Sequence, residues 1–313
     1  MEVDIAECGT FPRAYIDDIR KLIDLSKKQL DSTLEHKINA WEKANPSKRG
    51  SLPTIETVIS EMSKGFGGRF YDLGLCATFP ALAPMLLSKK LSTFRSDDIT
   101  DNLNKMSDED LKNHTFWPHI DTIRNSSQKM DFIIQKIQDM LNDKERHQDV
   151  PETRPVLRKK MIILTIAPMI GYLIALVLRK EFPKTRQTVV LANEPITKRE
   201  ALYKPFSRMT DEEVSEDRNT EDPLILITTA RISGEGFNFT RANYVVMVEP
   251  AFAKQIEDQA FHRVHRQGQQ ATTHLFSLYS LWNPAEVIVR SRQDTRSKLL
   301  LDESVWQVPE ADA

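Results

Sequence analysis

Residues 243–269 read NYVVMVEPAFAKQIEDQAFHRVHRQGQ, a buried-strand pattern followed by an amphipathic helix pattern. The apolar run over 243–249 is typical of a strand that is covered on both faces. Glu249 and Pro250 lead from it into a helix that we expect over about 252–267, with Gly268 at its end. A strand followed directly by a helix of this kind is a building unit of a parallel sheet.

Two arginines stand near the C-terminal end of the expected helix. Arg263 and Arg266 lie three residues apart and, together with Gln255 and Gln259, form one polar stripe at helical spacing. Such a stripe is typical of a solvated helix face. It could equally present two planar guanidinium groups to phosphate oxygens, a geometry that lysine does not offer.

The same alternation of short apolar runs and amphipathic runs continues on both sides of this stretch. We expect strands at 161–166, 188–192, 224–228, 244–248 and 274–278, and helices at about 169–181, 197–209, 252–267 and 284–299. This order predicts an α/β fold: a parallel sheet with right-handed crossovers and helices on both faces.

The first half of the chain is expected to be mainly helical, because apolar residues recur at helical spacing over 15–41, 53–63, 71–88 and 126–141. We interpret the charged, proline-containing stretch 142–155 as a connection between domains. The expected organisation is a helical region over 1–145, an α/β domain over 156–300 and a tail over 301–313. The acidic stretch 209–222 is interpreted as a solvated surface loop.

Bulk properties give weak constraints on partners and compartment. With 43 basic and 45 acidic residues, the chain has no overall field that demands nucleic acid or an anionic membrane, so DNA contact requires a local patch. Cys8 and Cys76 form no metal-ligand cluster, which favours a reducing compartment. The acidic N-terminus lacks the features of a signal peptide.

Residues 161–178 carry no charge and reach the lower limit of a membrane span. Pro168 and Gly171 favour a different interpretation, in which a buried strand is followed by a turn and then a helix. No membrane association is therefore expected, and a single span remains the alternative.

A glycine-rich turn, Ser233-Gly-Glu-Gly-Phe-Asn238, precedes the opening stretch. Gly234 and Gly236 permit positive φ and close approach of the backbone to a phosphate or sugar, and Asn238 can hydrogen-bond across the loop. Ligands bind at the carboxyl edge of parallel sheets. We expect this turn and the arginine helix to open onto that edge, although such a turn alone is a weak signal.

From about 159 to 278 the chain resembles the second RecA-like lobe of superfamily-two helicases, specifically of the Swi/Snf-type chromatin-remodelling and DNA-translocating ATPases. Their fifth motif, a strand, an AGGxGxN-like turn and AxxVIxxEP, corresponds to 224–250 here. Their sixth, QxxxQAxxRxHRxGQ, is matched by Gln255, Gln259, Ala260, Arg263, His265, Arg266, Gly268 and Gln269. Residues 161–181 and 126–130 are more loosely similar to the fourth motif and to the segment that leads into this lobe.

The resemblance implies a role for each matched residue. Arg263 and Arg266 would be arginine fingers acting on ATP, and Gly234, Gly236, Gln255 and Gln259 would bind the nucleotide. Asn238, Arg231 and His265 would couple the nucleotide site to DNA. The resemblance also implies ATP with magnesium only when a first lobe is present, double-stranded DNA or chromatin as the partner, and a nuclear location.

Half of the ATP site is missing from this sequence, which contains no GxxxxGK followed by Ser or Thr and no DExH pair. The glycine-rich stretch 64–69 lacks the lysine and hydroxyl that would follow, and 75–80 resembles the stretch that joins the two lobes. We therefore expect a C-terminal lobe, a fragment or a truncated relative, that is inactive without a P-loop-containing first lobe in cis or in trans.

Departures from the family pattern keep other interpretations open. Ser233 stands where the family usually has glycine, Ala230 where it has threonine and His262 where an acid is common. Residues 191–200 lack the glycine-serine-threonine sequence and the well-placed arginine that normally follow this strand. The alternatives are a non-catalytic interaction module and an RNA helicase lobe. A metal site at His262 and His265 lacks a third ligand, so no metal is expected.

Overall fold

The computed structural model describes residues 4–9, 12–47, 50–62, 68–88, 103–104, 106–142, 159–191, 196–207, 223–233, 237–265 and 272–293. They fall into two compact units: unit 1 comprises Met1–Glu7 and Phe94–Tyr279, and unit 2 comprises Cys8–Thr93 and Ser280–Ala313, as far as these are described. The division does not fall within 142–155. The stretch 143–158, the acidic stretch 209–222 and the tail 301–313 lie outside the described residues.

Unit 1 contains a six-stranded sheet with the strand order β1-β6-β5-β2-β4-β3. The pairings of β2 with β4, β2 with β5, β3 with β4 and β5 with β6 are parallel. The strands are β1 (Asp4–Cys8), β2 (Met161–Thr165), β3 (Gln187–Val190), β4 (Ile225–Thr229), β5 (Tyr244–Met247) and β6 (His274–Ser280). Every described residue of β2, β4 and β5 is buried, as expected of central parallel strands.

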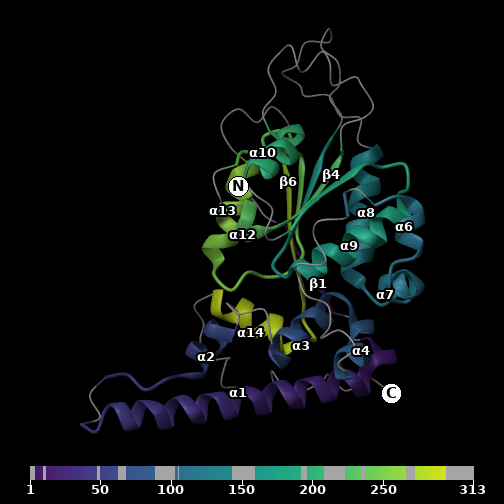
Figure 1. Cartoon of the computed structure of the whole chain (residues 1–313). Coiled ribbons are helices and arrows are strands. Elements are labelled where there is room, and N and C mark those ends of the chain that lie inside the picture. The colour runs from purple at the N-terminus through teal and green to yellow at the C-terminus, as the bar shows by residue number, and fades with distance from the viewer. Residues whose placement is uncertain are drawn as a thin grey trace. The chain divides into compact units, whose positions relative to one another are not determined.

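Helices cover both faces of this sheet, so the α/β fold with a parallel sheet is confirmed. Helix α9 (Pro168–Glu181), which follows β2, lies on one face together with α8 (Gln128–Asn142) (Figure 1). Helices α10 (Ile196–Tyr203) and α13 (Lys254–Val264) lie on the other face. The connections that leave β2 and β5 therefore pass to opposite faces of the sheet.

The uncharged run 161–178 forms the strand and helix that Pro168 predicts. Pro168 occupies the first turn of α9, where its missing N–H costs no helical hydrogen bond. Gly171 packs closely against the sheet: a Cβ at this position would lie 2.6 Å from Leu191 Cδ2 and 3.1 Å from Thr165 Oγ1. None of the helices in the described ranges is long and apolar enough to cross a membrane.

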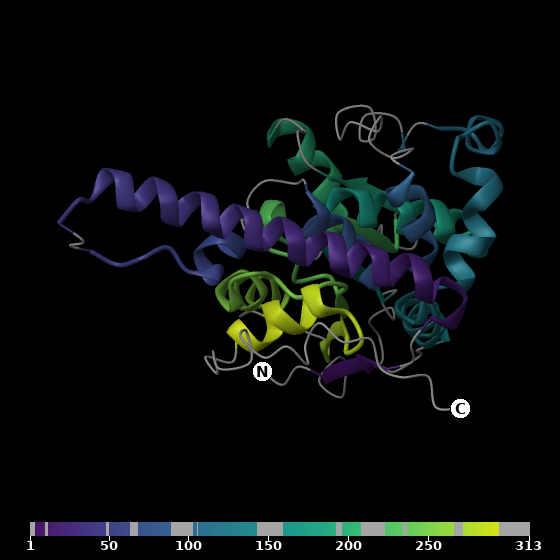
Figure 2. The same cartoon turned by 90° about the horizontal axis from the view of Figure 1, so that it is seen from below.

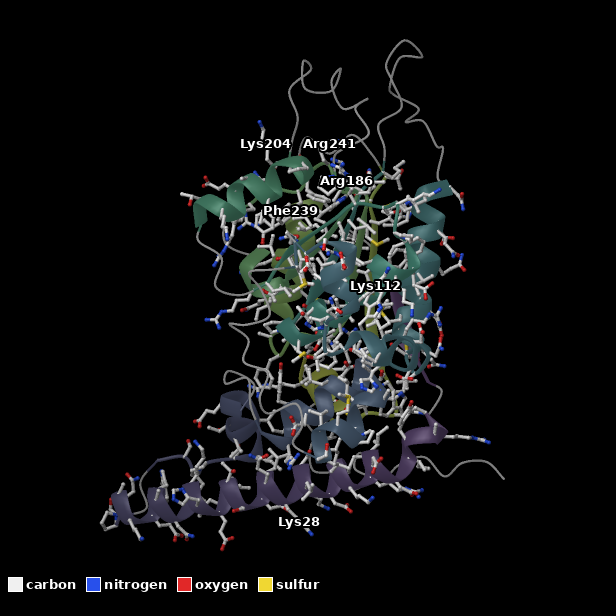
Figure 3. The ribbon with its side chains drawn as sticks, turned by 45° about the vertical axis from the view of Figure 1, so that its right-hand side comes forward. Lys28, Lys112, Arg186, Lys204, Phe239 and Arg241 are labelled. Carbon is white, nitrogen blue, oxygen red and sulfur yellow. The ribbon has the colours of Figure 1, made fainter. Side chains whose placement is uncertain are left out.

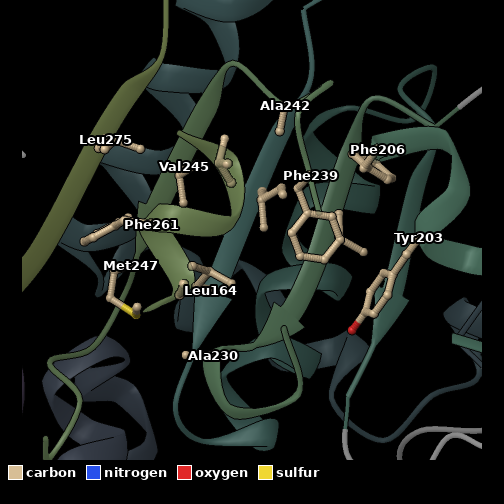
Figure 4. Close-up of a cluster of buried hydrophobic side chains, with 14 of the residues drawn as sticks. Leu164, Tyr203, Phe206, Ala230, Phe239, Ala242, Val245, Met247, Phe261 and Leu275 are labelled. Carbon is tan, nitrogen blue, oxygen red and sulfur yellow. The ribbon is translucent and has the colours of Figure 1, made fainter. Parts of the chain in front are cut away.

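The core between the sheet and the α10/α13 face is a continuous apolar cluster (Figure 4). Helix α10 is shorter than the sequence predicts, because a 3₁₀ turn, η5 (Lys204–Phe206), replaces its last turn at Pro205. This turn contributes Phe206 to the cluster. The other members of the cluster that Figure 4 labels are Leu164, Tyr203, Ala230, Phe239, Ala242, Val245, Met247, Phe261 and Leu275.

Within the described range 106–142, α8 is preceded by α6 (Asp108–Lys112), the 3₁₀ turn η4 (Trp117–His119) and α7 (Ile120–Asn125). Ser107 and Asp110 form a capping box at the start of α6. Asn104 is hydrogen-bonded to both backbone groups of Val189, which fastens this segment to the edge strand β3.

Unit 2 is helical, as expected for the first half of the chain. It contains η1 (Arg13–Tyr15), α1 (Ile16–Ala44), α2 (Ile55–Met62), α3 (Arg69–Thr78), η2 (Pro80–Leu82), α4 (Ala83–Leu87) and α14 (Pro284–Gln293). Figure 2 shows α1 as a long rod, and its buried residues, Ile19 to Leu30, all lie in its first half. Ser280 and Asn283 donate hydrogen bonds to the carbonyls of Ala77 and Leu73, which joins the C-terminal segment to α3.

Candidate functional site

Helix α13 turns its apolar side to the sheet, as its sequence spacing predicts. Ala260 and Val264 are buried, and Ile256 packs on the core cluster. On the other side of the helix Gln255 and Gln259 are exposed, and Arg263 is half-buried near the C-terminal end. The helix ends at Val264, with His265 as an exposed C-cap residue, so the described part of the polar stripe faces outward.

The segment that follows the glycine-rich turn contacts the end of this helix. The backbone N–H of Phe239 donates a hydrogen bond of 2.8 Å to the carbonyl oxygen of Arg263. Asn238, next to Phe239, is exposed. The structure thus brings together the two segments that carry the candidate residues, although Gly234, Gly236 and Arg266 themselves lie outside the described residues.

A short helix separates β4 from the turn. The sequence pattern places the turn just beyond the strand, but α12 (Ala230–Ser233) intervenes after Thr229. Ala230 is buried in the core cluster, and Arg231 is exposed. Arg231 therefore lies on a helix directly after the carboxyl end of β4.

Phe239 and Arg263 meet away from the carboxyl end of β5, whereas α13 begins near that end. A helix that connects adjacent parallel strands must run back from the carboxyl edge toward the amino edge. Arg263 is nine residues beyond Lys254, where α13 begins, and at 1.5 Å per residue this is about 14 Å along the helix. Gln255 lies near the carboxyl edge, and Arg263 lies near the far end.

The carboxyl edge itself is held by buried charged side chains. Glu249, two residues after β5, accepts hydrogen bonds through Oε2 from the backbone nitrogens of Ile166 (2.9 Å) and Ala167 (3.2 Å), just after β2. Lys129 of α8 is 1% exposed, and its Nζ donates to the carbonyl oxygen of Val248 at 2.7 Å. These bonds join the β2 and β5 connections where they pass to opposite faces, a position at which α/β sheets commonly bind ligands.

Side chains of α13 itself form a hydrogen bond and an ion pair at the N-terminal end of the helix. Glu257 is fully buried; its Oε1 accepts a hydrogen bond from the backbone nitrogen of Ala251 at 2.7 Å, and its Oε2 lies 3.2 Å from Nζ of Lys254. Sequence patterns did not reveal the contacts of Lys129, Glu249 or Glu257. The only sequence feature that marked these three residues was a charged side chain within or beside an apolar run.

His262 and His265 are both exposed. Within the described ranges, no group of three His, Cys, Asp or Glu side chains could hold a metal ion. The surface of α13 carries the amides of Gln255 and Gln259 and the guanidinium of Arg263, together with the carboxylate of Asp258 and the imidazole of His262.

Comparison with known proteins gives short sequence matches. No family model matches the chain. It is 46% identical over 52 residues to the DNA repair protein RAD5 of Cryptococcus neoformans and 40% identical over 53 residues to the DNA repair protein rad8 of Schizosaccharomyces pombe. A probable global transactivator of Orgyia pseudotsugata multicapsid polyhedrosis virus is 34% identical over 73 residues. These stretches cover 17%, 17% and 23% of this chain and 4%, 5% and 15% of the relatives.

Solved structures match almost the whole chain. The C-terminal part of the Fun30 ATPase domain superposes with a TM-score of 0.50 and 18% identity, over 99% of this chain and 94% of that one. The chain has the fold of a Swi/Snf-like ATPase C-terminal lobe. A Sulfolobus solfataricus SWI2/SNF2 ATPase C-terminal domain is also similar, with a TM-score of 0.46 and 14% identity over 97% of this chain and 92% of its own.

In this fold the two most specific sequence motifs lie on neighbouring elements. The stretch that resembles the fifth motif runs from β4 through α12 to β5, and the stretch that resembles the sixth begins within α13. The hydrogen bond between Phe239 and Arg263 connects the two.

Proposed function

We propose that this chain is the C-terminal lobe of a Swi/Snf-like DNA-dependent ATPase, and that Arg263 and Arg266 act as arginine fingers on an ATP held mainly by a first lobe. The supporting observation is the 2.8 Å hydrogen bond from Phe239 N to Arg263 O. It fixes the end of the arginine helix against the segment that follows the glycine-rich turn. A shift in either element is therefore passed directly to the other.

The arginines supply positive charge during phosphoryl transfer. The transferred γ-phosphoryl group carries charge on its equatorial oxygens, and a fixed guanidinium stabilises that charge in the transition state. Packing of Ala260 and Val264 on the core limits the motion of the helix that carries Arg263. Loss of an arginine finger costs roughly three to five powers of ten in rate in comparable systems.

The remaining candidate residues would bind the nucleotide or couple the nucleotide site to DNA. Gln255 and Gln259 would donate hydrogen bonds to the nucleotide from the exposed side of α13, and Gly234 and Gly236 would let the backbone approach it. Bound ATP brings magnesium, which would be held by the phosphates and by carboxylates of the first lobe. This chain supplies guanidinium, amide and backbone groups.

Asn238, Arg231 and His265 would contact the DNA backbone and transmit the nucleotide state. Such contacts position a protein on a duplex without reading its sequence. Arg231 is exposed on α12, and Asn238 and His265 are exposed beside the Phe239–Arg263 bond. The relatives RAD5 and rad8 are DNA repair proteins, which supports double-stranded DNA or chromatin as the partner and a nuclear location.

An ATPase assay of a reconstituted two-lobe protein tests this function. The chain is joined to, or mixed with, a P-loop-containing first lobe of a Swi/Snf-like ATPase, and hydrolysis is measured with and without duplex DNA. We expect Arg263→Ala and Arg266→Ala each to reduce the stimulated rate by at least about a thousandfold. Arg20→Ala, on the exposed surface of α1, is the matched control and should leave the rate unchanged.

The chain alone provides the opposing test. We expect no hydrolysis without the first lobe. DNA-stimulated hydrolysis by the purified chain that disappears in Arg266→Ala would overturn the proposal that this chain carries only half of the ATP site. Stronger stimulation of the two-lobe protein by single-stranded RNA than by duplex DNA would favour an RNA helicase lobe.

A non-catalytic module is the second candidate, because the sequence contains neither a GxxxxGK[ST] nor a DExH motif. It predicts that the chain assembles with no P-loop-containing polypeptide and that adding a first lobe produces no ATPase. Recovery of a P-loop partner from nuclear extract, with ATPase restored in the complex, would exclude it.

A further inference from the structure

Three aromatic rings meet where the chain leaves the glycine-rich turn. Phe237 and Phe239 follow the turn, and Tyr203 is the last residue of α10. The ring centroids of Tyr203 and Phe237 are 4.6 Å apart at an interplanar angle of 71°, and those of Tyr203 and Phe239 are 5.1 Å apart at 85°. Both pairs have the edge-to-face geometry that aromatic rings prefer. We call these three residues the three-ring group.

The two segments that carry the rings are separated in the sequence by β4 and α12 but are adjacent in unit 1. Figure 4 shows the rings of Tyr203 and Phe239 side by side. In Figure 3, Phe239 lies near Lys204, which follows Tyr203 in the chain. Tyr203 is fully buried, and its hydroxyl lies 2.9 Å from Oγ1 of Thr228 in β4. The Tyr203 ring is therefore held by α10 at one end and by the sheet at the other.

The three-ring group accounts for the outward direction of Asn238. Phe237 packs partly buried on the core cluster, Phe239 is buried, and Asn238 between them is exposed. This alternation is that of an extended segment. The rings of Phe237 and Phe239 are 6.5 Å apart and inclined by only 22°, so both lie on the inner side. A shift by one residue would bury the amide of Asn238 and expose two phenyl rings, so the rings determine which side chain faces solvent.

Residues on both sides of the glycine-rich turn are anchored in the same core. Ala230, which begins α12 before the turn, belongs to the core cluster, and so does Phe239 after the turn. Phe239 N also donates the 2.8 Å hydrogen bond to Arg263 O. Movement at the end of the turn therefore reaches Arg263 through Phe239, and the contacts of the Tyr203 ring limit that movement.

We propose that Tyr203 and Phe237 are positioning residues for the proposed ATPase. The three-ring group holds the exit of the glycine-rich turn, so that Asn238 faces outward, toward bound DNA, while Phe239 stays bonded to Arg263. This inference rests on the proposed function, and it gives a role to α10, which carries none of the candidate site residues. Loss of the Phe237 ring should weaken the connection between DNA and the ATP site without removing a group that contacts either one.

Hydrogen exchange of the purified chain tests the hold on this segment directly. The amide of Phe239 is protected by its bond to Arg263. In Phe237→Leu we expect this amide to exchange about three- to tenfold faster, the effect of one lost aromatic pair on local opening. Phe237→Tyr keeps the ring and should exchange as the parent does. Phe237→Met, also without a ring, gives the same measurement if Phe237→Leu does not fold.

Phe132→Leu is the matched control. Phe132, on α8 at the opposite face of the sheet, is also half-buried, and its ring forms a T-shaped pair with Phe276 at 5.4 Å and 72°. The loss of this ring should lower the free energy of unfolding by a similar amount and leave exchange at Phe239 unchanged. Equal acceleration at Phe239 in Phe132→Leu and Phe237→Leu, or no acceleration in Phe237→Leu, overturns the proposal.

The same variants in the two-lobe ATPase test the functional part of the inference. With duplex DNA, Phe237→Leu should lower kcat about three- to tenfold and leave KM for ATP near the parent value, because the groups proposed to bind the nucleotide are retained while Arg263 is positioned less well. Phe237→Tyr should restore kcat, and Phe132→Leu should not change it. An unchanged kcat in Phe237→Leu, with faster exchange at Phe239, overturns the positioning role.

The two experiments separate this inference from the proposed function. If Arg263→Ala leaves hydrolysis unchanged, the arginine-finger function is wrong, whereas faster exchange at Phe239 in Phe237→Leu still supports the hold of the rings on the segment. If Arg263→Ala abolishes hydrolysis while Phe237→Leu changes neither exchange nor kcat, the proposed function stands and the role of the three-ring group is wrong.

Discussion

The carboxylate of Glu249 lies 2.9 Å from the backbone nitrogen of Ile166, so that one side chain joins the connections leaving β5 and β2. The same oxygen accepts a hydrogen bond from Ala167, the N-cap residue of α9. A negative charge at this position also interacts favourably with the N-terminal end of the helix dipole. Glu249 therefore stabilises the loop after β2 as an anion bound in that loop would.

Replacing Glu249 should destabilise unit 1. Glu249→Ala leaves two backbone donors without their acceptor, and we expect the free energy of unfolding to fall by about 2–4 kcal/mol in a urea titration. Glu249→Gln keeps a neutral acceptor and should cost about 1 kcal/mol. Glu200→Gln, at an exposed position of α10, should stay within about 0.5 kcal/mol of the parent. Equal stability of Glu249→Ala and the parent would contradict a stabilising role for the hydrogen bonds of Glu249 to Ile166 and Ala167.

Two glycines give a matched pair with opposite expected effects. In Gly171→Ala the new Cβ would lie 2.6 Å from Leu191 Cδ2, in a core that cannot yield freely, so we expect a loss of about 1–3 kcal/mol. In Gly74→Ala no atom lies within 4 Å of the new Cβ, and α3 should gain about 0.4–1 kcal/mol. Thermal unfolding of both variants checks this, and a stabilised Gly171→Ala would contradict the packing of α9.

Acid should weaken the fold through His114. Its Nδ1 accepts a hydrogen bond from Phe116 N at 3.2 Å and its Nε2 bonds to the Tyr172 hydroxyl, so the folded state holds a neutral ring. Burial lowers the pKa of His114 from its usual 6.5. The unfolded chain then binds more protons, and this contribution to stability is complete above about pH 6.5 and is lost as the pH falls toward the folded pKa.

Alkali should act through Tyr172 in the opposite direction. Burial raises the pKa of its hydroxyl from 10.0 to about 12, so its contribution is complete below pH 10 and is lost as the pH rises toward 12. The free energy of unfolding, measured by urea titration from pH 4 to 11, should fall less at low pH in His114→Gln and less at high pH in Tyr172→Phe than in the parent. An unchanged pH dependence of stability in both variants would contradict the signs of the two pKa shifts.

The sheet was largely readable from the sequence because its central strands are buried on both faces. Runs such as MIILT in β2 and YVVM in β5 carry no charged residue, and their predicted boundaries differ from the structure by one residue. Strand β1 was missed, because DIAEC is short and half polar and joins the sheet only through β6, far away in the sequence. Helix α6 was also missed, although Ser107 and Asp110 carried a capping signal.

The site was predicted in part. The residue types on α13 and their outward direction followed from helical spacing, and so did the buried side of the helix. The placement of Arg263 near the amino edge required the helix direction, which depends on the parallel pairing of β5 with β6. The contacts of Glu249 and Lys129 link residues about 80 and 120 positions apart, and no local pattern encodes such partners.

Strand β1 has a consequence for how unit 1 is assembled. Glu7 accepts a hydrogen bond from the Tyr279 hydroxyl across 272 residues of sequence, and β1 lies at the end of the strand order beside β6. The edge of the sheet can therefore close only after β6 has been synthesised, so residues 4–8 must wait unpaired on the ribosome while all the other strands emerge. Contacts of such long range are slow to form, and we expect this edge to be the last part of unit 1 to become protected from hydrogen exchange during refolding.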